Sequence, residues 1–235
     1  MMSDNQSGNE NDTEDRIKEL PISISRIGEV SSYGDKMLIN IPWGHMYLSL
    51  EPKGETAFRI FSDLVRKRCY DCDRDDSFVC ESIACAECTL PCPCRTCKKG
   101  RPGGLIVSRR NPARIRKEFN LQTTPIVWLT SIPGNYNLNP EKTGIIEKLV
   151  NDFIDRTKRS VVLIEGLEYL ININGFSQIL RMLEDINDMV MIHESIVIVT
   201  VDERILDSRE LAYLQRNTTS LQKIVEEQVN LENSE

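Results

Sequence analysis

The chain has 235 residues, of which 29 are basic and 36 acidic, so its formal net charge is −7. A hydrophobic fraction of 40% is enough to form a core and excludes a wholly disordered chain. No apolar run approaches the ~20 residues of a membrane-spanning helix. The first residues are polar and acidic, unlike a secretory signal. We therefore expect a cytoplasmic protein that does not enter the membrane.

The expected organisation is one domain between two acidic tails. Residues 1–20 show no apolar periodicity and predict a disordered tail, and residues 21–43 predict short N-terminal strands. An α/β domain is expected over residues 44–216, with a Cys-rich insertion at 69–101 inside it. Residues 217–235 form the expected acidic C-terminal tail, into which a helix could continue through Leu221, Ile224 and Val225 before it frays.

Apolar runs and amphipathic segments alternate through the expected domain. The apolar runs predict strands at 46–50, 104–108, 125–130, 160–164 and 195–200. Helices are predicted from Glu55, from Asn111 to Phe119, from Asn139, from Phe176 to Val190, and after a capping box of Asp207 and Glu210. Continuous apolar strands between amphipathic helices are typical of a parallel sheet covered on both faces. We predict a three-layer α/β fold.

All eight cysteines fall in one short segment, with three C-x-x-C pairs among them. They are Cys69, Cys72, Cys80, Cys85, Cys88, Cys92, Cys94 and Cys97. Clustered thiols in a chain without a secretory signal indicate metal binding more than disulfides. Eight thiolates match two tetrahedral zinc sites, so about two Zn²⁺ ions are expected. An iron–sulfur cluster and redox-active thiols are the alternatives.

Four segments resemble a known family: Gly104–Phe119, Thr124–Thr130, Val161–Ile171 and Asn174–Phe176. Together they resemble the archaeal family called domain of unknown function 835, over about residues 44–216. Members of that family often lie at the end of multi-domain sensory proteins, and membership implies no catalytic activity. The Cys-rich insertion departs from the family pattern.

The order of elements also resembles the KaiC and RecA type of ATPase, in which a strand, a phosphate-binding loop and a helix are followed by a strand that ends in an acidic residue. By this resemblance Gly54 and Thr56 match the G-x-x-x-x-G-K-[ST] loop, whereas Glu55 stands in place of its lysine. Glu51 adds negative charge where phosphate would lie, and Pro52 lacks an N–H donor. We expect a degenerate loop.

Glu165 ends a predicted buried strand, where an acidic residue can bind Mg²⁺ through water. The alternative is a turn residue that accepts hydrogen bonds from backbone amides near Gly166. His193 is expected to cap a helix, and Trp128 and Tyr169 are expected to be packing or interface residues. We therefore expect no catalytic residue.

Basic residues gather just after the cysteines, and no acidic residue interrupts them between Cys88 and Lys117. They are Arg95, Lys98, Lys99, Arg101, Arg109, Arg110, Arg114, Arg116 and Lys117. Such a segment can contact nucleic-acid phosphates, an acidic protein or only solvent.

The sequence thus predicts a non-enzymatic intracellular regulatory or protein-interaction module, with a function in signalling, a degenerate nucleotide-binding fold and structural zinc. A nucleic-acid-binding factor that uses the zinc knuckle and the basic segment is the alternative. A third possibility is an ATPase with an altered phosphate loop.

Overall fold

The computed structural model of the chain describes residues 41–66, 102–157 and 159–232. The expected acidic N-terminal tail, nearly all of the expected N-terminal strands and the Cys-rich insertion lie outside these residues. All eight cysteines therefore fall outside the described part of the chain, as do the first four basic residues of the basic segment.

The described residues form strands and helices in alternation. The strands are β1 (His45–Leu50), β2 (Gly104–Ser108), β3 (Ile126–Leu129), β4 (Asn137–Leu138), β5 (Val161–Glu165), β6 (Ile196–Val201) and β7 (Thr219–Ser220). The helices are α2 (Glu55–Arg66), α4 (Pro112–Phe119), α5 (Thr143–Thr157), α6 (Leu167–Asn174), α7 (Phe176–Ile192), the 3-10 turn η1 (Glu203–Ile205), α8 (Ser208–Asn217) and α9 (Leu221–Glu232).

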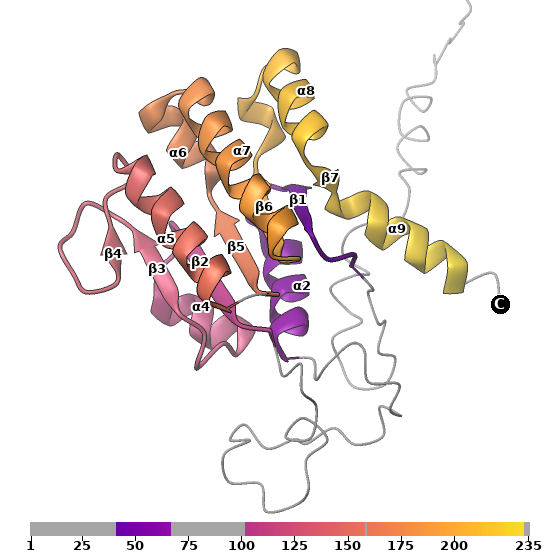
Figure 1. Cartoon of the computed structure of the whole chain (residues 1–235), viewed down its shortest axis with the longest axis horizontal. Helices are drawn as coiled ribbons and strands as arrows, with labels where there is room; N and C mark the ends of the chain where they lie inside the picture. The colour runs from indigo at the N-terminus through magenta and orange to yellow at the C-terminus, as the bar shows by residue number, and fades with distance from the viewer. Residues whose placement is uncertain (1–40, 67–101, 158, 233–235) are drawn as a thin grey trace, which may run out of the picture. The chain divides into compact units, whose positions relative to one another are not determined.

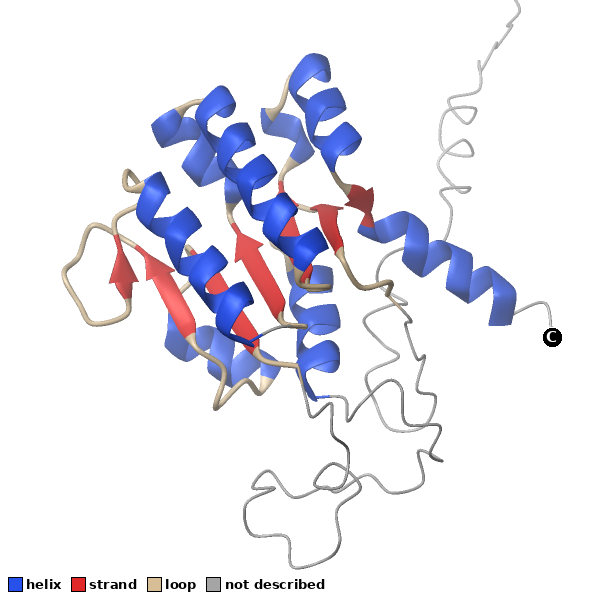
Figure 2. Ribbon diagram, viewed as in Figure 1, coloured by secondary structure: helices blue, strands red, loops and turns tan. Residues whose placement is uncertain are grey.

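The strands form one sheet in the order β4-β3-β2-β5-β6-β1-β7, and each pairs in parallel with its neighbours. Helices α5, α7 and α8 cover the face toward the viewer in Figure 1, and α2 and α4 cover the opposite face. The red strands of Figure 2 lie between these two layers of blue helices. The structure therefore confirms an α/β fold with a parallel sheet between helices.

Buried apolar side chains hold the layers together. On one face, side chains such as Val162, Ile164 and Val199 pack with Ile146 and Ile186 of α5 and α7, all of them buried. On the α2–α4 face, the buried rings of Phe58 and Phe119 stack with centroids 4.6 Å apart. Burial of these strands on both faces explains why they appear in the sequence as continuous apolar runs.

Local capping signals specify several helix ends. Asn111 accepts a hydrogen bond from the Ala113 amide at the start of α4, and Pro112 occupies the first turn. Asp207 and Glu210 form the expected capping box of α8 through hydrogen bonds of 2.7 and 3.1 Å. These sequence predictions are confirmed because caps depend on neighbours in the chain.

Other boundaries differ from the sequence predictions. Helix α5 begins at Thr143 rather than near Asn139, because Asn139 closes a turn by accepting from the amides of Glu141 and Lys142. The short helix α6 was not predicted. It follows β5 after a single residue, Gly166, whose positive φ of 87° ends the strand and lets the helix begin at once. Strand β4 was also not predicted from the sequence.

The expected end of the domain at residue 216 needs correction. The sheet continues into β7, and α9 covers residues that were expected to form an acidic tail. Leu221 and Val225 of α9 are fully buried and α9 packs on β1, so this helix belongs to the domain. In Figure 1 the end of α9 extends away from the sheet.

Both edges of the described sheet consist of very short strands. β4 and β7 each contain two residues, and each pairs on one side only. No helix within the described residues is both long and apolar enough to cross a membrane.

Candidate functional site

A row of four polar side chains crosses the sheet near the carboxyl ends of its central strands. Ser108 of β2 pairs with Glu165 of β5, and Thr200 of β6 pairs with Ser49 of β1. All four are buried, with exposed fractions of 0 to 7%. We call these four residues the polar row. Because ligands of parallel α/β sheets bind outside the carboxyl ends of the strands, this edge is the candidate site.

Glu165 is held by hydrogen bonds from the neighbouring strand. The Ser108 hydroxyl donates to its Oε2 at 2.5 Å, and the Arg109 amide donates to the same oxygen at 3.2 Å. The Gly166 amide instead donates to Thr200 Oγ1 at 3.3 Å. Glu165 thus accepts from one backbone amide, as the turn-residue alternative expected, but the amide is that of Arg109 and not that of Gly166. Arg109 directly follows β2, which the parallel register brings alongside β5.

The loop between β1 and α2 folds over this edge. Gly54 adopts a φ of +65°, and a Cβ atom at this position would lie 3.2 Å from Glu165 Cγ and 3.4 Å from Thr200 Cγ2. Glycine is therefore required both by the backbone conformation and by the close approach. The structure thus brings together Gly54 and Glu165, two residues that the sequence analysis singled out separately.

The amides at the start of α2 are bound to Glu51. Its Oε2 accepts from the Thr56 amide and its Oε1 from the Ala57 amide, both at 2.9 Å. The Ser49 hydroxyl also donates to Oε1 at 2.7 Å. Glu55, the residue at the lysine position of the loop, is exposed in the first turn of α2, and its side chain does not take part in the Glu51 hydrogen bonds. Glu51 thus caps α2 with a carboxylate.

Two more acidic residues, Glu168 and Asp202, lie at the same edge of the sheet. Burial raises the pKa of Glu168, the charge of Glu165 raises it further, and hydrogen bonds from the amides of Glu168 and Asp202 offset only part of this. Asp202 pairs with Arg204 at 2.6 Å, and this hydrogen-bonded pair lowers the pKa of the Asp202 carboxyl. The edge is therefore acidic.

The raised pKa of Glu168 predicts a pH-dependent effect of Glu168→Gln. Between the ordinary pKa of 4.5 and the raised value, the folded state binds more protons than the unfolded state. The wild-type protein therefore loses stability as the pH rises through this range. We expect Glu168→Gln to be more stabilising, relative to wild type, at pH 7 than at pH 4. Thermal melts at both pH values would show this, with the exposed Glu203→Gln as control. An equal difference at both pH values would contradict the assignment.

These carboxylates do not form a recognisable metal site. Within the described ranges, no group of three or more His, Cys, Asp and Glu side chains is arranged to hold a metal ion. The predicted ligands, the eight cysteines, lie outside those ranges, so the two zinc ions remain a prediction.

Three of the five described residues of the basic segment are engaged within the chain. Arg116 donates to the carbonyl oxygens of Leu121, Gln122 and Thr124 and so holds the turn that follows α4. Arg110 pairs with Glu118 and lies over the rings of Phe58 and Phe119.

Arg109, the third of these residues, lies over the Tyr169 ring with its guanidinium carbon 4.7 Å from the ring centroid. Its carbonyl oxygen accepts from Trp128 Nε1 at 3.0 Å. Trp128 and Tyr169 therefore pack against the β2–α4 turn, in agreement with the predicted packing role.

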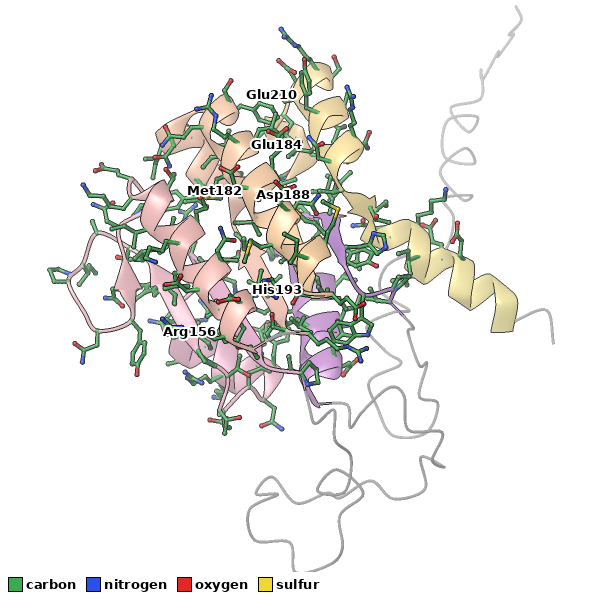
Figure 3. All side chains as sticks on the ribbon, in the orientation of Figure 1. Arg156, Met182, Glu184, Asp188, His193 and Glu210 are labelled. Atoms are coloured by element: carbon green, nitrogen blue, oxygen red, sulfur yellow. The ribbon has the colours of Figure 1, made fainter. Side chains whose placement is uncertain are left out.

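His193 lies away from the candidate site. It caps the C-terminus of α7 through its amide, and its Nε2 lies 3.5 Å from Asp155 of α5. Its carbonyl oxygen accepts from Arg159, just before β5 begins, which places it at the amino edge of the sheet. Figure 3 shows it at the end of α7, in the same region as Arg156. The expected capping role is confirmed.

Comparison with known proteins identifies a family. Residues 94–218, more than half of the chain, match the family described as "Protein of unknown function (DUF835)". The chain belongs to the DUF835 family. The DUF835 match begins near the end of the cysteine segment and spans β2 to α8, so β1, α2 and α9 lie outside it. Glu165 and Ser108 lie inside the DUF835 region, whereas Glu51 and Ser49 lie outside it.

Other comparisons add little to the DUF835 assignment. No curated protein matches the chain. A solved structure from Pyrococcus horikoshii OT3, titled as a structural study, aligns with a TM-score of 0.41 and 11% sequence identity. The alignment covers 76% of this chain and 81% of that one. A similarity at this level carries no argument about fold or function.

Proposed function

We propose that this DUF835 protein is a non-enzymatic intracellular regulatory or protein-interaction module with a degenerate nucleotide-binding fold and structural zinc. One observation carries the proposal. At the edge of the sheet where a nucleotide would bind, the polar groups are already bound to each other: Glu51 to the first amides of α2, and Glu165 to Ser108 and the Arg109 amide.

The order of elements supports the degenerate RecA- or KaiC-like fold within this proposal. Strand β1 leads through a short loop into α2, and β5, separated from β1 by β6, ends in Glu165. Gly54 brings the loop against Glu165, as a phosphate loop would approach a metal-binding carboxylate.

The side chains at this place do not fit a nucleotide. Glu51 occupies amides that a phosphate would need, and Glu55 replaces the lysine that would reach the phosphates. One carboxylate about 4 Å from a phosphate charge costs roughly 4 kcal/mol at an effective dielectric of 20. The simplest consequence of these side chains is that the protein does not bind a nucleotide, rather than that it hydrolyses one differently.

Some exposed apolar side chains are available for contacts with other proteins. Eight large ones are at least 37% exposed among the described residues: Ile132, Tyr136, Ile145, Ile173, Met191, Ile192, Ile205 and Tyr213. The resemblance to modules of sensory proteins favours a role in signalling.

The nucleic-acid alternative receives less support from the described part of the basic segment. Arg109, Arg110 and Arg116 contact groups of the chain itself. The side chains of Arg114 and Lys117 on α4 are exposed, so two of the five basic side chains are available for phosphates.

The proposal predicts that the wild-type chain binds no nucleotide. Calorimetric titration with ATP–Mg should give no signal corresponding to a Kd below about 1 mM, and no ATP hydrolysis should exceed the rate of the Glu165→Ala variant. The physical reasons are that Glu51 already accepts from the amides at the start of α2 and that the carboxylates add negative charge where phosphate would lie.

A Kd in the micromolar range would overturn the proposal. Turnover that disappears in Glu165→Ala would favour the third candidate, an ATPase with an altered loop. The variant Glu203→Ala, which changes an exposed acidic residue outside the polar row, controls for loss of charge.

A further inference from the structure

The carboxylate of Glu51 occupies the place that an anionic ligand would take at α2. The backbone amide of Glu51 donates to the Val201 carbonyl at 3.0 Å, so the sheet itself fixes where the side chain starts. Its two oxygens then receive the amides of Thr56 and Ala57, one each, at 2.9 Å. Helix N-termini favour negative charge, because their amides point outward and the helix dipole is positive there.

The same carboxylate belongs to a network that extends to α9. Ser49 donates to Glu51, and the side-chain amide of Gln222 donates to Ser49 Oγ at 3.2 Å and to the Leu50 carbonyl at 3.4 Å. Gln222 lies in the first turn of α9, beside the fully buried Leu221. The end of β1, the start of α2 and the start of α9 therefore share one set of hydrogen bonds.

We propose that Glu51 is an internal anionic ligand: it fills the phosphate position at α2 and converts this position into a structural joint between β1, α2 and α9. Nucleotide is then excluded by an occupant of the site, and not by a lack of amide donors. This inference deepens the proposed loss of nucleotide binding by naming the group that occupies the site.

The inference is tested by removing the Glu51 carboxylate through mutation and supplying a small anion from solution in its place. In the full-length protein, Glu51→Ala should lower the melting temperature by roughly 2 to 6 °C, since a lost cap and its hydrogen bonds destabilise the helix start. Sodium acetate or sodium phosphate, compared with sodium chloride at equal ionic strength, should then restore part of the loss by binding to the freed amides. Hydrogen exchange at Thr56 and Ala57 should become faster in the variant and slow again with the anion.

Glu55→Ala is the matched control, because it removes the same charge from the first turn of α2 without touching the Glu51 hydrogen bonds. Wild type and Glu55→Ala should respond to acetate and phosphate only as they do to salt in general. Glu51→Gln, which keeps the side-chain length but not the charge, should lose stability and respond less than Glu51→Ala. If Glu51→Ala folds only in acetate or phosphate, the inference gains support.

Two results separate the inference from the proposed function. If acetate and phosphate shift Glu51→Ala no more than Glu55→Ala, while wild type still binds no ATP, Glu51 is not an internal ligand and the proposed function stands. If wild type binds ATP–Mg with micromolar affinity, the proposed function itself is wrong.

Discussion

Replacing Ile164 with alanine is expected to destabilise the domain strongly. Ile164 lies in β5, the middle strand of the sheet, and is completely buried among residues of the α5–α7 face. Loss of a large side chain from such a core costs about 2 to 5 kcal/mol, a large part of the 5 to 15 kcal/mol that holds a typical domain together. The melting temperature should fall by roughly 5 to 15 °C.

Ile145→Ala provides a control with the same chemical change. Ile145 lies in the first turns of α5, and its side chain is 53% exposed. Its replacement should change the free energy of unfolding by less than about 0.5 kcal/mol. Urea unfolding of both variants, with unchanged slopes, would measure the difference. Equal losses in the two variants would mean that the sheet is packed differently from the structure described above.

The second large effect concerns the metal. The purified chain should be colourless and contain about two Zn²⁺ ions, because eight thiolates fill two four-coordinate sites. Cys94→Ser together with Cys97→Ser should remove at least one ion, and protease should then cut between Cys69 and Arg101. The α/β domain should keep its main unfolding transition, because the core described above is built from residues outside the cysteine segment.

Metal analysis by mass spectrometry, with Thr96→Ser as control, checks this expectation. Thr96 lies between Cys94 and Cys97, so its replacement alters the same segment but no thiol. If the purified protein is brown and absorbs near 400 nm, the bound metal is an iron–sulfur cluster and not zinc. Collapse of the whole fold on chelation would show that the cysteine segment belongs to the core of the domain.

The sequence predicted the layers well because parallel strands and amphipathic helices have local patterns. Runs such as 161–164 are apolar throughout, and caps such as Asn111 and Asp207 act on neighbours in the chain. The C-terminal helix was underestimated because its acidic residues, Glu226 and Glu227, suggested a solvated tail. Leu221 and Val225 became core residues only through packing against β1.

The candidate site was predicted only in part. The sequence analysis singled out Gly54 and Glu165, and it noted the negative charge of Glu51. It did not predict that the Glu51 carboxylate accepts hydrogen bonds from the amides at the start of α2. Which amides a carboxylate reaches depends on the path of the loop, and Ser108 becomes a partner of Glu165 only once the sheet is assembled. One signal was available: Ser49, Ser108, Glu165 and Thr200 each stand at or next to the end of an apolar run.

The two-residue edge strands limit how another protein can bind the described domain. A peptide that adds a strand to a sheet gains affinity from a ladder of backbone hydrogen bonds, and β4 and β7 offer little backbone for such a ladder. Short edge strands also disfavour aggregation of two copies of the chain through their sheet edges. If the described domain binds a protein as proposed, we expect the contacts to be made by side chains of its helices and loops, and surface substitutions could then change specificity without altering the sheet.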